Sequence, residues 1–285
     1  MSRNSNRMAR KAPPETTEPT PQQLEQPIQA VRRTANTEFV ELPSRGLFYP
    51  KNHPLHGQEV VEIRFMTARD EDILTSPALL RKGVAIDKFI QNILVDQSIR
   101  VPDLLIGDKS AIMVAARVTG YGPEYEVKIT CPECGTENDV TVDLTDYHRY
   151  FEKFEQSEHF KLNRDGHFDT KLPMSGQQVT VRLMTSRDET QMSNRMNTKK
   201  KNKLAETNTT DFLKSIIVSI DGETNPSDLN DMIGDMPARD SRFLRKNYSK
   251  LVPSVRLKED FECMYCGAET ETEVPLEATF FWPDI

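Results

Sequence analysis

The feature that most constrains the fold is an internal repeat in the sequence. Residues 61–71 (VEIRFMTARDE) align without gaps to residues 179–189 (VTVRLMTSRDE), and seven of the eleven positions are identical. Similarity between two segments of one chain indicates that one structural unit occurs twice. With 285 residues, the chain is long enough for two ordinary domains or for one domain built from a duplicated unit. The sequence therefore predicts a tandem duplication.

Four further segments match between the two copies. They are LPSRG at 42–46 with LPMSG at 172–176, FIQNILV at 89–95 with FLKSIIV at 212–218, PDLLIGD at 102–108 with SDLNDMIGD at 227–235 across a two-residue gap, and CPECG at 131–135 with CMYCG at 263–267. The spacing between matched residues grows from 118 at the methionine of MTARDE to 132 at the first cysteine, so the second copy carries a net 14 extra residues. We place these in a solvated basic loop at 199–203 (KKKNK) and around residues 221–223.

Each copy predicts the same order of elements. Apolar residues alternate over 61–65 and 179–183, as in a half-buried strand. Thr67 and Thr185 then each lie three residues before an aspartate, a spacing typical of a capping box at a helix start. A strand, a CxxCG turn and another strand end each copy. Further helices are expected near 83–97 and 108–118 in the first copy, and near 209–219 and 238–249 in the second.

The four cysteines form two CxxC pairs, each followed by a glycine that permits the positive φ of a tight turn. They are Cys131, Cys134, Cys263 and Cys266. Zn²⁺ binds four thiolates in a tetrahedron, and a CxxC turn holds two of them at a suitable distance. We therefore predict one structural zinc shared by both copies, since four thiolates leave no open position for water or substrate. A disulfide within or between the pairs, or two hairpins without a metal, are the alternatives.

The predicted fold class is α+β: a tandem duplicated unit of strand, helices and β-hairpin zinc knuckle, with a shared four-cysteine, zinc-ribbon-like site. The predicted domains are a disordered, proline-rich basic tail at 1–36, a first repeat at 37–145, a linking helix and loop at 146–170, and a second repeat at 171–285. The segment TDYHRYFEKF at 145–154 predicts the linking helix. The tail is expected to be disordered because its first 35 residues hold five prolines and few aliphatic side chains.

Charge is spread unevenly along the chain. The net charge of −7 divides into +3 over residues 1–35 and −10 over residues 36–285. An acidic body repels a phosphate backbone, so general nucleic-acid binding is disfavoured. The basic tail fits either a solvated terminus or an arm that orders on an acidic partner.

Neither membrane insertion nor export is expected. No stretch approaches the roughly 20 apolar residues that span a bilayer, and the N-terminus lacks the apolar region of a secretory signal. We therefore place folding in a cytosol, where thiols stay reduced.

No catalytic residue is predicted. The Arg-Asp-Glu groups at 69–71 and 187–189 are explained by helix capping, because acids in the first turn complement the helix dipole. The five histidines show neither zincin spacing nor a triad order, and GYGP at 120–123 predicts a turn, not a phosphate-binding loop. The C-terminal FFWPDI at 280–285 is costly to leave in water. It is expected to pack on its own domain or to dock onto another subunit.

The order of several motifs resembles a known family. They are LPSRGLFYP at 42–50, MTARDEDIL at 66–74, IGD at 106–108 with a helix reaching Arg117, and YGPEYEVKITCPECG at 121–135. In this order they resemble the baseplate hub protein family of T4-type contractile-tailed phages, most densely over 39–150. The resemblance implies a non-enzymatic component that is needed to build the central baseplate hub and is made in the host cytoplasm. It leaves open whether the protein stays in the mature virion.

The leading functional hypothesis is a structural or assembly protein of a phage tail baseplate. Its partners would be other hub or wedge proteins, with no small-molecule substrate, and self-association stays open. One alternative is a zinc-ribbon nucleic-acid-binding module anchored by the basic tail. Another is a hydrolase that uses carboxylates near the metal, which four cysteines on one zinc would exclude.

Overall fold

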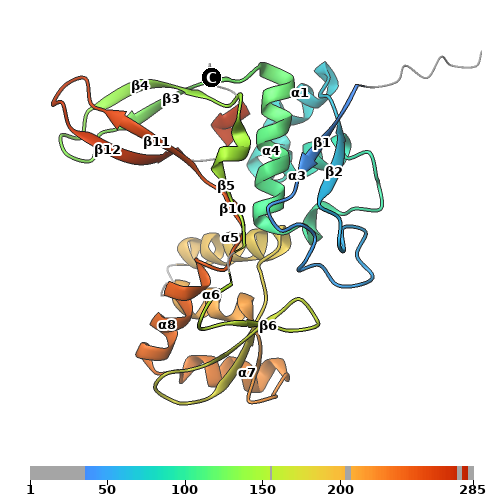
Figure 1. Cartoon of the computed structure of the whole chain (residues 1–285), viewed down its shortest axis with the longest axis vertical. Helices are drawn as coiled ribbons and strands as arrows, with labels where there is room; N and C mark the ends of the chain where they lie inside the picture. The colour runs from blue at the N-terminus through green and yellow to red at the C-terminus, as the bar shows by residue number, and fades with distance from the viewer. Residues whose placement is uncertain (1–35, 155, 203–206, 275–277, 282–285) are drawn as a thin grey trace, which may run out of the picture. The chain divides into compact units, whose positions relative to one another are not determined.

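The computed structural model describes residues 36–154, 156–202, 207–274 and 278–281 (Figure 1). Within these ranges the helices are α1 (Ala68–Thr75), α2 (Pro77–Lys82), α3 (Ala85–Ile93), α4 (Ile106–Tyr121), α5 (Ser186–Lys201), α6 (Asn208–Ile216), α7 (Pro226–Gly234) and α8 (Ala238–Tyr248). The strands are β1 (Thr37–Glu41), β2 (Val60–Arg64), β3 (Glu124–Thr130), β4 (Glu137–Asp143), β5 (Phe151–Glu152), β6 (Lys161–Leu162), β7 (Phe168–Lys171), β8 (Gln178–Val181), β9 (Ile217–Ile220), β10 (Ser254–Val255), β11 (Leu257–Glu262) and β12 (Glu269–Val274).

The fold is mixed α+β, as the sequence predicts. The described strands form four two-stranded sheets and one four-stranded sheet in the order β6-β7-β8-β9, and all of their pairings are antiparallel. No helix in the described ranges is long and apolar enough to cross a bilayer. Almost all of the tail predicted at 1–36 lies outside the described residues.

In the first repeat, a strand pair packs against helices α3 and α4. Val40 of β1 lies opposite Val61 of β2, and Ile63 forms an isolated bridge with Leu94 just after α3. Helix α4 has an almost entirely buried middle, including Ile112. Apolar residues that alternate along β2 therefore face a core that α3 and α4 complete.

The second repeat forms a similar arrangement. Thr170 of β7 lies opposite Val179 of β8, and Val181 pairs with the first residue of β9, just after α6. Val179 and Val181 are aligned in sequence with Val61 and Ile63. The strand pairing around the repeated VxVR and VEIR segments is thus the same in both halves of the chain.

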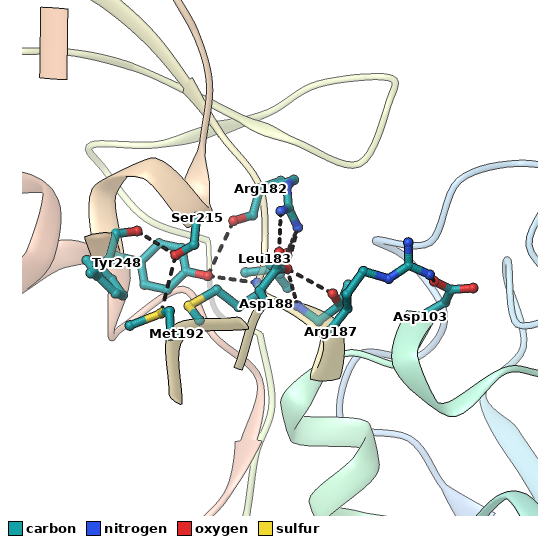
Figure 2. A network of polar contacts seen from close by, with 11 residues as sticks. Asp103, Arg182, Leu183, Arg187, Asp188, Met192, Ser215 and Tyr248 are labelled. Atoms are coloured by element: carbon teal, nitrogen blue, oxygen red, sulfur yellow. Dashed lines mark hydrogen bonds and ion pairs between the residues drawn. The ribbon is translucent and has the colours of Figure 1, made fainter. Parts of the chain in front are cut away.

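The joint between strand and helix is also built alike in both repeats. Arg182, directly after β8, donates from its two terminal nitrogens to Asp188 at 2.7 and 2.8 Å (Figure 2). The amide and hydroxyl of Thr185 both donate to the same carboxylate at 2.8 Å. Arg64, the last residue of β2, and Asp70, in the first turn of α1, form the same pair at the same two distances. Both helices begin with a capping box. The predicted capping role of the Arg-Asp-Glu groups is confirmed.

In each repeat, a second buried carboxylate binds the LPSRG or LPMSG loop to the start of a helix. Asp108, near the start of α4, accepts hydrogen bonds from the amide and the hydroxyl of Ser44 at 3.0 and 2.5 Å. Asp240, near the start of α8, accepts from the amides of Met174 and the next residue at 2.8 and 2.9 Å. Ser44 lies in LPSRG and Met174 lies in LPMSG. In both repeats an aspartate at a helix start therefore accepts hydrogen bonds from loop amides.

This contact corrects the alignment of the two IGD segments. That alignment pairs Asp108 with Asp235, but Asp235 is an exposed residue just after α7. The residue that occupies the place of Asp108 is Asp240, which lies 132 residues further along, the same spacing as between the cysteine pairs. Part of the extra length of the second repeat is helix α7, where the first has only a 3-10 helix at Val101–Asp103.

Two predicted loops and links differ from the structure. Residues 199–201 of the basic run form the last turn of α5 instead of a loop, because lysine favours helix and its charge complements the helix C-terminus. The helix predicted over 145–154, which overlaps the 146–170 link, is wrong beyond one 3-10 turn at Tyr147–Tyr150. The residues after that turn form β5, which pairs with β10, so strand pairing overrides the local helical pattern.

The two repeats meet where α5 begins. The amide of Ser186 donates to the carbonyl of Leu104 at 2.8 Å, and Lys109 of α4 donates to the Ser186 hydroxyl at 2.9 Å. Arg187 turns away from the capping network and pairs with Asp103 at 2.5 Å (Figure 2). The start of α5 is therefore tied to the segment that leads into α4.

The end of the described chain returns to the first repeat. Phe280 and Phe281 are fully buried. The Phe280 ring contacts Tyr125 edge-on and the Phe281 ring contacts Phe89 edge-on, with ring centroids 4.8 and 5.2 Å apart. Arg117 of α4 donates to the Phe280 carbonyl at 3.1 Å. Packing on their own domain, the second repeat, is one of the two expectations for the C-terminal aromatics, and these two residues pack instead on the first repeat of the same chain. Residues 282–285 lie outside the described residues.

Candidate metal centre

Two β-hairpins carry the four cysteines. Strands β3 and β4 form the first, and β11 and β12 form the second, which lies beside it (Figure 1). In the first hairpin, Tyr125 and Ile129 alternate inward from β3, and Leu257 and Phe261 do the same from β11. These inward side chains anchor the hairpins to the core, so that their turns are presented at the far end.

Each turn has the geometry of a metal knuckle. In the first, the amide of Cys131 donates to the Thr136 carbonyl and the amide of Gly135 donates back to Cys131, both at 2.9 Å. The second turn repeats both bonds at 2.9 Å, with Cys263 in the place of Cys131. Gly135 and Gly267 adopt φ of 72° and 68°, where a side chain would be strained. The predicted need for glycine at both positions is confirmed.

The turns bring all four sulfur atoms together. Cys131 Sγ lies 3.8 Å from Cys266 Sγ, and Cys134 Sγ lies 3.7 Å from Cys263 Sγ. All four atoms lie within 4.8 Å of one another. A tetrahedron with Zn–S bonds of about 2.3 Å has sulfur atoms about 3.8 Å apart. The residues present therefore fit a tetrahedral four-thiolate ion, with each repeat supplying two ligands.

The electrostatics of the cluster also fit a cation. Burial raises the pKa of Cys263, but the amides of Cys266 and Tyr265 and neighbouring sulfurs outweigh it and lower the pKa to about 6. The Ala268 amide lowers the pKa of Cys266, yet burial and the other three sulfurs raise it to about 12. Four thiolates this close repel one another, and a bound cation removes that repulsion.

Sequence reasoning missed one residue of this centre, Asn138. Its side chain is 4 % exposed, and its nitrogen lies 3.6 Å from Cys263 Sγ. Its oxygen accepts a hydrogen bond from the Met264 amide at 3.1 Å. Asn138 belongs to the first hairpin, so it fixes the position of Cys263 and its neighbour in the second hairpin. An asparagine in a strand of alternating polar residues carries no pattern that marks this role, because the contact spans more than 120 residues.

The other residues considered for a functional site do not form a second cluster within the described residues. Within the described residues, the four cysteines are the one group of three or more His, Cys, Asp or Glu side chains placed to hold a metal. His53 stacks on Tyr49 at 4.3 Å, and its Nδ1 accepts from the Leu55 amide. GYGP forms the end of α4 and the residues that follow it. These contacts are those of packed structural residues.

Comparison with protein families decides the class of the chain. A family model described as T4 bacteriophage base plate protein matches residues 35–282, which is most of the sequence. The chain belongs to this family. The resemblance seen in the order of its motifs is thereby confirmed, and the described fold and cysteine cluster lie inside the matched range. Neither the curated proteins nor the solved structures compared with it give a match.

Membership of the T4 base plate protein family supports a structural role in the phage baseplate. A baseplate protein contacts other baseplate proteins and belongs to the tail of the virion. The arrangement of the cysteines adds a chemical property to that role, since it places four thiols that could hold a metal ion, two from each repeat, in one cluster.

Proposed function

We propose that this protein is a non-enzymatic component of the phage baseplate hub, built in the host cytoplasm, which acts by binding other hub or wedge proteins. The observation that carries the proposal is the match of residues 35–282 to the T4 base plate protein family. The acidic body supports protein partners over nucleic acid, because phosphates require lysine and arginine. The zinc-ribbon nucleic-acid module is for this reason the weaker candidate.

We also infer that the two repeats arose as one duplicated unit, with domains at 37–145 and 171–285. Three contacts support this: the strand pairing, the capping box with its arginine, and the aspartate that holds the glycine loop. Each of them occurs once in the first repeat and once, at the corresponding residues, in the second. Residues with no shared origin would have no reason to reproduce all three with closely similar distances.

The proposed metal is one structural Zn²⁺ held by Cys131, Cys134, Cys263 and Cys266. All four ligands would be protein thiolates, so the ion has no position for substrate and would act by joining the two hairpins. Such sites contribute apparent binding energies of about 10 kcal/mol in small zinc peptides. The metal would thus join the two repeats at the turns of their hairpins.

Co-expression tests the proposed function. The full chain is produced with the hub and wedge proteins encoded by the same phage and passed over a size-exclusion column. We expect it to migrate with at least one of them, with zinc in the same fraction. Failure to migrate with any of them, together with a salt-sensitive shift of DNA or RNA at low salt, would contradict the proposal and favour the nucleic-acid module.

A further inference from the structure

The tip of the second knuckle exposes two large apolar side chains. Met264 and Tyr265, between the cysteines of the CMYC turn, are 85 % and 70 % exposed. Among the described residues, these are the most exposed of the large hydrophobic side chains. Tyrosine and methionine are enriched in the cores of protein interfaces, where they contribute contact area.

The backbone that carries this tip is held firmly. The Met264 amide is bonded to Asn138, and the turn is closed by the Cys263–Ala268 and Gly267–Cys263 hydrogen bonds. A side chain on an ordered turn loses little backbone entropy when a partner binds it. The turn is therefore already ordered before a partner binds.

The surface behind the tip is strongly acidic. Residues 257–274 carry six acids against one lysine, and the exposed Glu262 and Glu269 face each other across the hairpin just behind the knuckle. Asp260, Glu262, Glu269 and Glu271 also line a shallow hollow of about 450 Å³ on the same hairpin. A partner that covers the apolar tip must therefore bring positive charge to its rim.

The first knuckle shows that the apolar tip is not needed to form the turn. Its two inner residues are the exposed Pro132 and Glu133, and it makes the same closing hydrogen bonds. The chain therefore contains a polar tip and an apolar tip on turns of equal geometry. A stability requirement explains the shared turn, but it does not explain two exposed apolar residues on one copy.

We propose that Met264 and Tyr265 form a docking plug that inserts into an apolar pocket, rimmed by lysine or arginine, on another baseplate protein. This proposal rests on the baseplate function proposed above and specifies the surface through which it acts. The plug supplies the desolvated centre of the contact, and the glutamates of β11 and β12 supply the charged rim.

The test uses a variant copied in part from the first knuckle. The variant Met264→Ser with Tyr265→Glu removes the plug. Serine, and not the proline of the first knuckle, replaces Met264 because proline has no amide hydrogen to donate to Asn138. We expect zinc content and melting temperature to match those of the native chain, and affinity for the co-expressed partner to fall about tenfold or more. Met174→Ser is the matched control, because Met174 is 63 % exposed at a different turn and should leave affinity unchanged.

Charge reversal tests the rim separately. Glu262→Lys with Glu269→Lys should also weaken the complex. Raising the salt concentration should reduce the difference in affinity between this variant and the native chain. Full affinity in either the plug variant or the charge-reversal variant, with zinc retained, would overturn the proposal. If the native chain itself binds no baseplate protein, the proposed function fails instead, so the two failures are distinguishable.

A photo-crosslinking amino acid in place of Tyr265 identifies the occupant. The expected product joins the tip to a baseplate protein, at a peptide whose apolar residues are flanked by lysine or arginine. A crosslink to a second copy of this chain, to lipid, or to an acidic peptide would overturn the proposal, as would the absence of any crosslink in the assembled complex.

Discussion

At the scale of single residues, buried polar groups make the decisive contacts. Asp70 has no exposed side-chain surface and binds Arg64, a capping threonine and Asn92. Burial alone would raise the pKa of Asp70, but these hydrogen bonds outweigh it and lower the pKa to about 2. The carboxylate is thus both a helix cap and half of an ion pair. Its loss would break the ion pair with Arg64 and remove the acceptor of three further donors, which are the Thr67 amide, the Thr67 hydroxyl and the Asn92 side chain.

Asp70→Asn should destabilise the protein by about 2 kcal/mol at pH 7, because a buried cap and an ion pair are lost together. Asp72→Asn, an exposed position on the same helix, should change stability by less than about 0.5 kcal/mol. Because the folded pKa of Asp70 lies below the ordinary 3.8, its contribution is complete above about pH 4 and declines as the pH falls towards 2. Urea denaturation at several pH values measures this, and a difference between Asp70→Asn and the native chain that persists unchanged at pH 2 would contradict it.

Asn138→Ala should weaken zinc binding by roughly ten- to a hundredfold, as expected for a residue that orients a ligand. Thr270→Ala provides the control, because Thr270 lies 132 residues further along, at the matching position of the second hairpin. Competition with a chromogenic zinc chelator measures both affinities. Equal affinity for the two variants would show that Asn138 does not support the ligand.

At the scale of elements, helix α4 fits closely against the segment that leads to the second hairpin. A Cβ atom added at Gly107 would lie 2.0 Å from the Pro253 carbonyl oxygen, so the backbones approach too closely for any side chain. Strand β10, which begins at Ser254, packs on α4 at this point. The glycine of the first IGD segment is therefore set by helix packing, which the sequence pattern alone does not reveal.

Gly107→Ala should destabilise the protein by about 1–3 kcal/mol, because rigid backbone must shift to admit the methyl group. Gly234→Ala, in the second IGD segment, has nothing within 4 Å of the new Cβ and should be neutral or stabilising by up to about 1 kcal/mol. Thermal unfolding of the two variants compares them directly. Similar melting temperatures would contradict the close packing of α4 and β10.

At the scale of the whole molecule, three contacts tie the repeats together. They are the sulfur cluster, the start of α5 on the segment before α4, and the C-terminal aromatic residues on the first repeat. Arg117 strengthens the last of these, since it also donates to the carbonyls of Gly122 and Glu124 at 3.0 Å. We therefore expect the described part of the chain to unfold as one cooperative unit.

Phe281→Ala should cost about 3–4 kcal/mol, the usual cost of emptying a fully buried aromatic site. Phe39→Ala, at a side chain that is 63 % exposed, should cost less than about 1 kcal/mol. Urea unfolding followed by circular dichroism should show a single transition for both variants. A separate early transition in Phe281→Ala would mean that the repeats are stable independently of each other.

Much of this arrangement could be predicted from local patterns. The repeated strand and capping box were predictable because they are contained in eleven adjacent residues, and the four cysteines because CxxCG is a short motif. The Asp108–Ser44 and Asn138–Met264 contacts were not, because each joins residues more than 60 positions apart and neither has a spacing rule. The IGD alignment was wrong for a related reason. It paired Asp108 with Asp235 because the sequences are identical there, whereas the aspartate in the corresponding position at a helix start is Asp240.

Elemental analysis of the purified, reduced chain directly tests the proposed joining of both repeats by one ion. We predict one zinc per chain, and complete loss of that zinc in either Cys131→Ser or Cys263→Ser, because each variant removes one of four shared ligands. A native chain without metal, a chain with two zinc ions, or a Cys263→Ser variant that keeps its zinc would contradict the shared centre.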